Sequence, residues 1–320
     1  MKDSKTYKKL NYSLELLRFI LSFFVVIQHC YKNILDKGRF HVPAFMITSF
    51  YFYYNTLKIK SINKIKQRFQ RILIPYIIWP IFEFIINNIL FKFYKFSQFD
   101  KILSLKDLLF QIIFGSNYHI IFYFQFNLIL FTKLFTIISF IFKKSFIFIF
   151  QIILIVSYIF QYTNWNFNAF KGYSDIFKYS LGHISELLPF AVGGLTLNYL
   201  NIIINLKKFK GFAIFFITVI IVLILKFEIF VRIKGFWFPG IFFNIGGLCI
   251  FILFSLISFE NRKLLFLLKI ITKYTGGIYY IHLICFSFLR RKINFLKNKT
   301  FHGAIVTYII SYITGKNNLQ

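Results

Sequence analysis

Long apolar runs alternate with short charged or polar segments along the chain. Spans of about 20 apolar residues are typical of helices that cross a bilayer core of roughly 30 Å. The runs predict an all-α fold, a polytopic membrane helix bundle of about ten transmembrane helices in one integral-membrane domain over 1–320, with no extra soluble domain. A shorter apolar piece at 107–114 is expected to be a half-helix at the membrane surface. The ten predicted spans are 14–31, 42–56, 72–91, 119–141, 145–161, 184–201, 211–229, 236–257, 264–287 and 302–315.

The composition supports a membrane class. The chain is 58% hydrophobic with 49 Phe, and only 15% of its residues are charged, which is more apolar surface than a soluble domain of 320 residues can bury. The net charge of +29 would suggest nucleic acid in a soluble protein. Here the cations fall in short segments beside the spans, where they set topology and contact anionic lipid headgroups, so nucleic acid is not an expected partner.

The basic clusters indicate an orientation. The richest one, KIKSINKIKQRFQR, has six cations from Lys58 to Arg71 and is expected to be a loop after the second span. With the four lysines before the first span, it favours a cytoplasmic N-terminus in a multi-pass protein of the cell (inner or plasma) membrane. The cluster RRKINFLKNK at 290–299 argues against this orientation.

The three cysteines are scattered. Cys30, Cys249 and Cys285 lie in or beside apolar runs, and the sequence has no CxxC pair. Neither a disulfide framework nor a metal site is therefore predicted.

The first span carries two titratable groups. Arg18 and His29 are eleven positions apart, which is about three helical turns and roughly 16 Å, so both side chains project from one face of a helix. Ionisable residues within spans are functional candidates, and histidine suits proton transfer near neutral pH. In the alternative interpretation, Arg18 only reaches the headgroups and His29 only makes a hydrogen bond near the outer boundary.

Six stretches, in order and over nearly the whole chain, resemble the membrane proteins of acyltransferase family three. Two departures occur: Ser49 is followed by Phe50 where the family usually has glycine, and the usual tryptophan after His119 is absent. The stretches are LELLRFILSFFVVIQH (14–29), VPAFMITSFYF (42–52), KIKQRFQRILIPYIIW (64–79), YHIIFYFQFNLILF (118–131), ELLPFAVGGLTL (186–197) and TGGIYYIHLI (275–284).

The resemblance implies transfer of an acyl group, usually acetyl, from cytoplasmic acyl-CoA to a hydroxyl of a glycan on the other side or of a lipid-linked saccharide. His29 is then the expected general base, with Arg18 as its catalytic companion and a covalent acyl-histidine as a variant. Arginine binds phosphate through a planar set of N–H groups, so the basic segment is expected to bind the phosphates of acyl-CoA. The predicted donor-binding residues are Lys64, Arg68, Arg71 and Tyr76, with Lys66 adding charge.

Further polar residues in or beside the spans are candidates for acceptor binding. Each of the two acids among them, Glu83 and Glu186, could orient a histidine, bind sugar hydroxyls, or only pair with a cation. The candidates are Glu83, His119, Glu186, Tyr279 and His282, whereas His41, His183 and His302 are expected to lie in loops.

Two other classes compete with an enzyme. A transporter or flippase for a glycosyl or anionic substrate would also need polar residues in its spans, but it predicts paired half-repeats that the sequence does not show. A structural or regulatory membrane protein predicts that His29 is dispensable. The sequence names neither the acceptor nor the oligomeric state.

Overall fold

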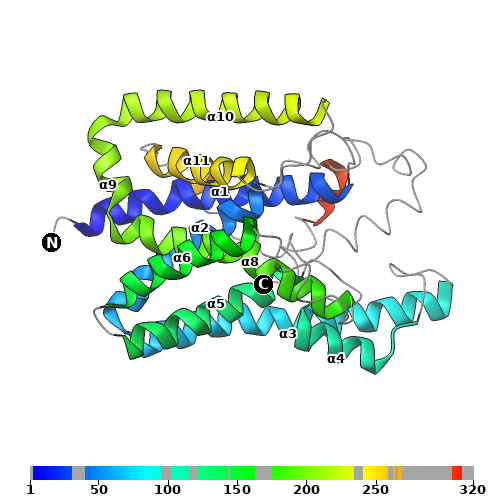
Figure 1. Ribbon diagram of the computed structural model, residues 1–320. Coiled ribbons are helices and arrows are strands. Elements are labelled where there is room, and N and C mark those ends of the chain that lie inside the picture. The colour runs from blue at the N-terminus through cyan, green and yellow to red at the C-terminus, as the bar shows by residue number, and fades with distance from the viewer. Residues whose placement is uncertain are drawn as a thin grey trace. The chain divides into compact units, whose positions relative to one another are not determined.

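The computed structural model describes residues 3–30, 40–94, 102–115, 122–142, 145–162, 175–233, 241–258, 263, 266–268 and 305–311. Within these ranges every regular element is a helix, which confirms the predicted all-α class (Figure 1). The chain divides into two compact units, one of Met1–Phe45 with Ile202–Gln320 and one of Met46–Asn201. The boundary falls inside helix α2, His41–Ile59.

The first unit is built around one long N-terminal helix. Helix α1 packs on α11, and α11 packs on α10 (Figure 1). The Ser22 hydroxyl of α1 lies 3.0 Å from the Tyr308 hydroxyl. Gly247 of α11 brings this helix close to the beginning of α2, because a Cβ atom there would lie 2.6 Å from Cβ of Pro43. The helices described in this unit include α1 (Asp3–Cys30), α9 (Ile202–Leu206), η3 (Lys207–Phe209), α10 (Lys210–Ile233) and α11 (Ile241–Leu256).

In its described residues the second unit contains the rest of α2 and five further helices. Helix α5 packs on both α3 and α8, and α8 packs on α6 (Figure 1). Helices α3 and α5 are antiparallel, because Arg68 contacts Thr132 whereas Tyr76, later in α3, contacts Phe122, earlier in α5. The five helices are α3 (Ile62–Tyr94), α4 (Leu105–Phe114), α5 (Phe122–Ile141), α6 (Phe146–Tyr162) and α8 (Asp175–Tyr199).

The basic segment expected to be a loop is helical instead. Helix α2 ends at Ile59, and Lys60 turns the chain with a left-handed φ of 51° while its N–H donates to the carbonyl of Leu57. Helix α3 begins at Ile62, so most of the cluster lies on its first turns. Charged residues with long aliphatic stems are good helix formers, and the helix therefore starts well before the apolar run.

Other boundaries also extend beyond the apolar runs. Helix α8 begins at Asp175, so His183 lies within it and Glu186 does not open it. His41 is the first residue of α2 rather than a loop residue. The predicted short element at 107–114 is confirmed as α4, which is capped by Ser104 and Asp107 and ended by the left-handed Gly115. His302 and most of the spans predicted at 264–287 and 302–315 lie outside the described residues.

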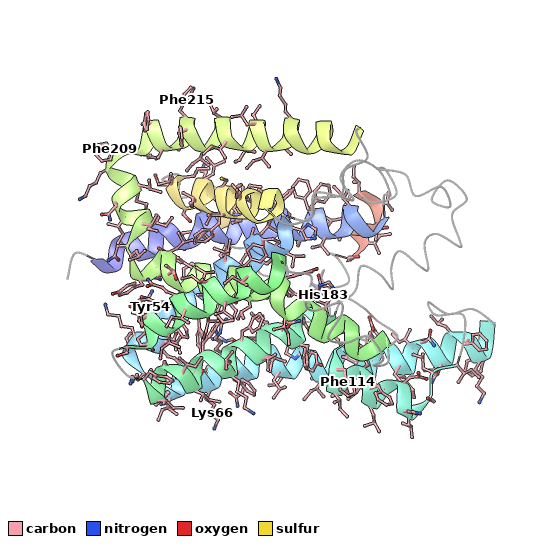
Figure 2. All side chains as sticks on the ribbon, in the orientation of Figure 1. Tyr54, Lys66, Phe114, His183, Phe209 and Phe215 are labelled. Atoms are coloured by element: carbon pink, nitrogen blue, oxygen red, sulfur yellow. The ribbon has the colours of Figure 1, made fainter. Side chains whose placement is uncertain are left out.

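Three helices in the described part of the chain are long and apolar enough to cross a membrane. They are Ile62–Phe93, Phe122–Ile141 and Ile202–Lys226. On α10 large apolar side chains such as Phe212 and Phe215 are about 70% exposed, which suits a lipid-facing surface (Figure 2). The total of ten spans stays a prediction.

Candidate functional site

Arg68 is held by two neighbouring helices. Its Nη2 donates to the Ser49 hydroxyl at 2.8 Å, and its Nη1 donates to the Ser49 carbonyl at 3.3 Å. Its Nε lies 3.5 Å from Thr132 Oγ1 of α5. The planar guanidinium group therefore ties α3 to both α2 and α5, since each of its three nitrogens meets an oxygen of one of these helices.

Two aromatic rings of α2 complete the surroundings of Arg68. The guanidinium carbon lies 4.3 Å from the centre of the Tyr53 ring and 5.3 Å from that of Phe50. Tyr53 is itself fixed, because its hydroxyl hydrogen-bonds Thr136 of α5. Phe50 adds a second aromatic wall beside the cation.

Lys64 and Arg71 lie on either side of Arg68 and are exposed. At about 100° per residue, they project within roughly 20° of each other on α3. Lys66, which is labelled in Figure 2, is also exposed. At about 100° per residue, it projects about 200° from Lys64. The sequence prediction grouped these cations together, whereas the structure groups Lys64, Arg68 and Arg71 and turns Lys66 away.

Tyr76 lies in the interior of the second unit. Its side chain is 4% exposed, its hydroxyl donates to the carbonyl of Ile112 at 2.7 Å, and its ring contacts Phe122 edge-on. This residue joins α3, α4 and α5. Its predicted contact with a donor stays a prediction.

Arg18 and His29 lie on one continuous helix, α1, as the spacing predicts. Arg18 is about half exposed, and its Nη1 lies 3.0 Å from Oε1 of Glu15, one turn earlier. Glu15 and Arg18 therefore form an exposed pair at i, i+3. The side chain of His29 lies outside the described residues.

The acidic candidates differ in environment. Glu83 of α3 is buried, with 2% exposure. Glu186 of α8 is half exposed, and its Oε2 lies 2.6 Å from Nδ1 of His183. The His183 ring stacks on Tyr123 of α5 with the ring centres 4.2 Å apart. His119, Tyr279 and His282 lie outside the described residues.

Comparison with protein families decides the assignment. The model of the acyltransferase domain matches residues 11–315, which is nearly the whole chain. The chain belongs to acyltransferase family three. Comparison with curated proteins and with solved structures finds no match.

Membership of acyltransferase family three confirms the family resemblance and supports a membrane-bound acyltransferase over a transporter or a structural protein. Among the residues that the structure describes, no three His, Cys, Asp or Glu side chains are grouped so as to hold a metal ion.

Sequence reasoning missed several residues around these candidates. Ser49, Tyr53 and Thr132 hold Arg68, and no local spacing connects them to it because they come from other helices. His183, the partner of Glu186, could have been predicted from the sequence. A His and a Glu three positions apart lie on one face of a helix.

Proposed function

We propose that this family-three acyltransferase moves an acyl group, in our proposal acetyl, from cytoplasmic acyl-CoA to a hydroxyl of an extracytoplasmic or lipid-linked saccharide. The carrying observation is the cation group on the first turns of α3, in which the clamped Arg68 lies between the exposed Lys64 and Arg71. Coenzyme A carries several phosphate charges, and such a group suits their binding.

The two arginines have different parts in this proposal. Arg71 and Lys64 are exposed and contact the donor phosphates. Arg68 is bound to Ser49 and Thr132, so it fixes the beginning of α3 and adds its charge to the group. Tyr76 supports the same region from inside by holding α4 against α3.

The chemistry requires one proton acceptor. The acceptor hydroxyl oxygen attacks the thioester carbonyl carbon, the C–S bond breaks, and the proton of the hydroxyl ends on the departing thiol of coenzyme A. In the proposal His29 takes that proton as general base, directly or through a water. Arg18 lies on the same face of α1 as His29 but roughly 16 Å away from it, so in the proposal it adds positive charge at the entrance and not at the reacting carbonyl.

The test uses the full-length protein in lipid nanodiscs with radiolabelled acetyl-CoA. The acceptor is the glycan and glycolipid fraction extracted from cells that lack the gene. We expect alkali-labile label to enter this fraction with wild-type protein and not with His29→Gln. Absence of any acetyl-CoA turnover by folded wild-type protein would refute the proposed function.

A further inference from the structure

Three lysines lie at the point where helix α10 begins. Lys207 and Lys208 form part of η3, and Lys210 is the first residue of α10. Lys208 and Lys210 are exposed, and Lys207 is partly buried. Among the residues that the structure describes, no carboxylate forms an ion pair with any of the three. The lysine cluster formed by these residues therefore concentrates three positive charges within four consecutive positions.

The lysine cluster lies at one end of the first unit. Nζ of Lys210 is 3.4 Å from Oγ of Ser258, which follows the end of α11. The neighbouring carbonyl of Ile257 accepts a hydrogen bond from the Ser13 hydroxyl of α1. The beginning of α10 therefore meets the end of α11, and the end of α11 meets the first half of α1. Lysines beside the ends of apolar helices are typical of the region where a membrane protein meets lipid headgroups.

An exposed aromatic surface continues from the lysine cluster along α10. Phe209 and Phe212 are 70% and 72% exposed, and Phe216 is 55% exposed (Figure 2). The rings of Phe212 and Phe216 stack with their centres 6.1 Å apart, so they form one continuous apolar face. This face belongs to the candidate membrane span Ile202–Lys226. Large apolar side chains with this much exposure suit contact with the acyl chains of lipids.

We propose that Lys207, Lys208 and Lys210 bind the phosphate of an anionic phospholipid, whose acyl chain lies against Phe212 and Phe216. The ammonium groups complement the negative charge of the headgroup, and the aromatic face complements the chain. Both parts of the ligand are matched by adjacent residues of one helix. The lysine cluster is thus a defined lipid site, distinct from the general attraction between a chain of charge +29 and anionic membranes.

Coenzyme A also carries phosphate groups, but the surroundings of the lysine cluster favour a lipid. The exposed aromatic face of α10 follows the lysines directly, and a water-soluble donor does not require such a face. A phospholipid has its charge and its apolar chains in the same order along the membrane normal as α10 has its lysines and its phenylalanines. Acetyl-CoA is therefore a competitor in the test.

A different origin of the same geometry would be a contact that only holds α10 against α11. In that case Lys210 matters through its contact with Ser258 alone, and Ser258→Ala would affect the protein in the same way as Lys210→Gln. A lipid site predicts instead that Lys210→Gln weakens the binding of anionic lipid and that Ser258→Ala does not.

The experiment titrates the full-length protein in a neutral detergent with dioleoylphosphatidylglycerol, and native mass spectrometry measures the bound lipid. Dioleoylphosphatidylcholine, which has the same chains on a zwitterionic headgroup, is titrated in parallel, and so is acetyl-CoA. The site variant replaces all three residues of the lysine cluster by glutamine. A control variant of equal net charge replaces three exposed lysines that lie elsewhere, Lys66, Lys133 and Lys226.

We expect the wild-type protein to bind phosphatidylglycerol more tightly than phosphatidylcholine, and the site variant to lose at least about tenfold in affinity for phosphatidylglycerol. The control variant should stay within about threefold of wild type, because its charges lie apart from one another. Phe212→Ala should weaken the binding of phosphatidylglycerol as well. Phe148→Ala, which removes a ring of similar exposure from α6, should leave that affinity unchanged.

Equal affinities of the wild-type protein for the two lipids would overturn the inference. Equal losses in the site and control variants would also overturn it, since they would show a diffuse charge effect. Acetyl-CoA binding that is lost in the site variant while phosphatidylglycerol binding is retained would assign the lysine cluster to the donor instead. An unchanged affinity of Phe212→Ala would overturn the placement of the acyl chain. None of these measurements uses turnover, so their outcome is independent of the proposed function.

Discussion

The guanidinium carbon of Arg68 lies 4.3 Å from the centre of the Tyr53 ring, and the same cation donates to the Ser49 hydroxyl. These contacts join α3 to α2. We predict that Arg68→Ala destabilises the protein by on the order of 2 to 4 kcal/mol, from lost charged hydrogen bonds and the cation–π contact. Thermal unfolding in detergent measures this change.

Arg68→Lys tests whether charge alone is sufficient. A single ammonium group cannot reproduce the fork that reaches Ser49 and Thr132 together, so we expect lysine to recover less than half of the lost stability. Unfolding temperatures of Arg68→Ala and Arg68→Lys equal to that of wild type would show that the contacts do not hold the helices.

Arg71 and Lys64 should behave differently from Arg68. Both are exposed, so Arg71→Ala and Lys64→Ala should leave the unfolding temperature near that of wild type. In our proposal each removes a contact to donor phosphate, so the KM for acetyl-CoA should rise about tenfold while kcat stays close to wild type. Steady-state kinetics of acetyl-CoA hydrolysis measures this.

Lys66→Ala is the matched control for this prediction. Lys66 is an exposed cation on the same turns of α3, but its helical phase is about 200° from that of Lys64. It should therefore change the KM for acetyl-CoA less than twofold. Equal effects of Lys64→Ala and Lys66→Ala would indicate a diffuse charge effect in place of a defined phosphate site.

Much of the fold could be predicted from the apolar runs, but the residues at which the helices begin could not. A run of apolar residues indicates which part of the chain is surrounded by lipid or by other side chains. The runs located α5 and α6 to within a few residues. Helical hydrogen bonding continues through polar residues, however, so α3 and α8 begin about ten residues before their apolar runs. The basic start of α3 was therefore mistaken for a loop.

The candidate site was predicted in part for a similar reason. Spacing within one helix correctly placed Arg18 and His29 on α1, whereas the segment with Arg68 and Arg71 was expected to be a loop and forms the beginning of α3. It could not show that Arg68 is clamped while Arg71 is exposed, because Ser49 and Thr132 come from helices distant in sequence. Contacts between helices depend on packing, and local periodicity carries no information about them.

The acid–base prediction concerns His29. A positioned general base contributes about 10² to 10⁴ in rate, so His29→Gln should lower kcat for acetyl transfer by at least about 10². Its KM for acetyl-CoA should change little, because the donor phosphates are bound by cations of α3 in our proposal. The matched measurement is acetyl transfer by Arg71→Ala, for which the KM for acetyl-CoA should rise while kcat stays close to wild type. A kcat of His29→Gln within threefold of wild type would exclude it as the base.

Gly194 of α8 lies close against the backbone of α2. A Cβ atom at this position would lie 2.4 Å from the carbonyl oxygen of Ile47 and 3.0 Å from the backbone nitrogen of Tyr51, both in α2. Backbone atoms cannot move aside cheaply, so Gly194→Ala must push α8 away from α2. The displacement would also strain the bond from the Asn198 amide to the Tyr51 carbonyl, which is 2.6 Å long.

The neighbouring Gly193 provides an internal control for this prediction. A Cβ atom at Gly193 meets nothing within 4 Å, so Gly193→Ala should stabilise α8 by up to about 1 kcal/mol through helix propensity. Gly194→Ala should instead destabilise by about 1 to 3 kcal/mol, since overpacking outweighs that gain. Thermal unfolding of the two variants in detergent compares the same chemical change one residue apart. Because α2 carries Ser49 and Tyr53, Gly194→Ala should also weaken the clamp on Arg68, and equal unfolding temperatures for the two variants would contradict this packing.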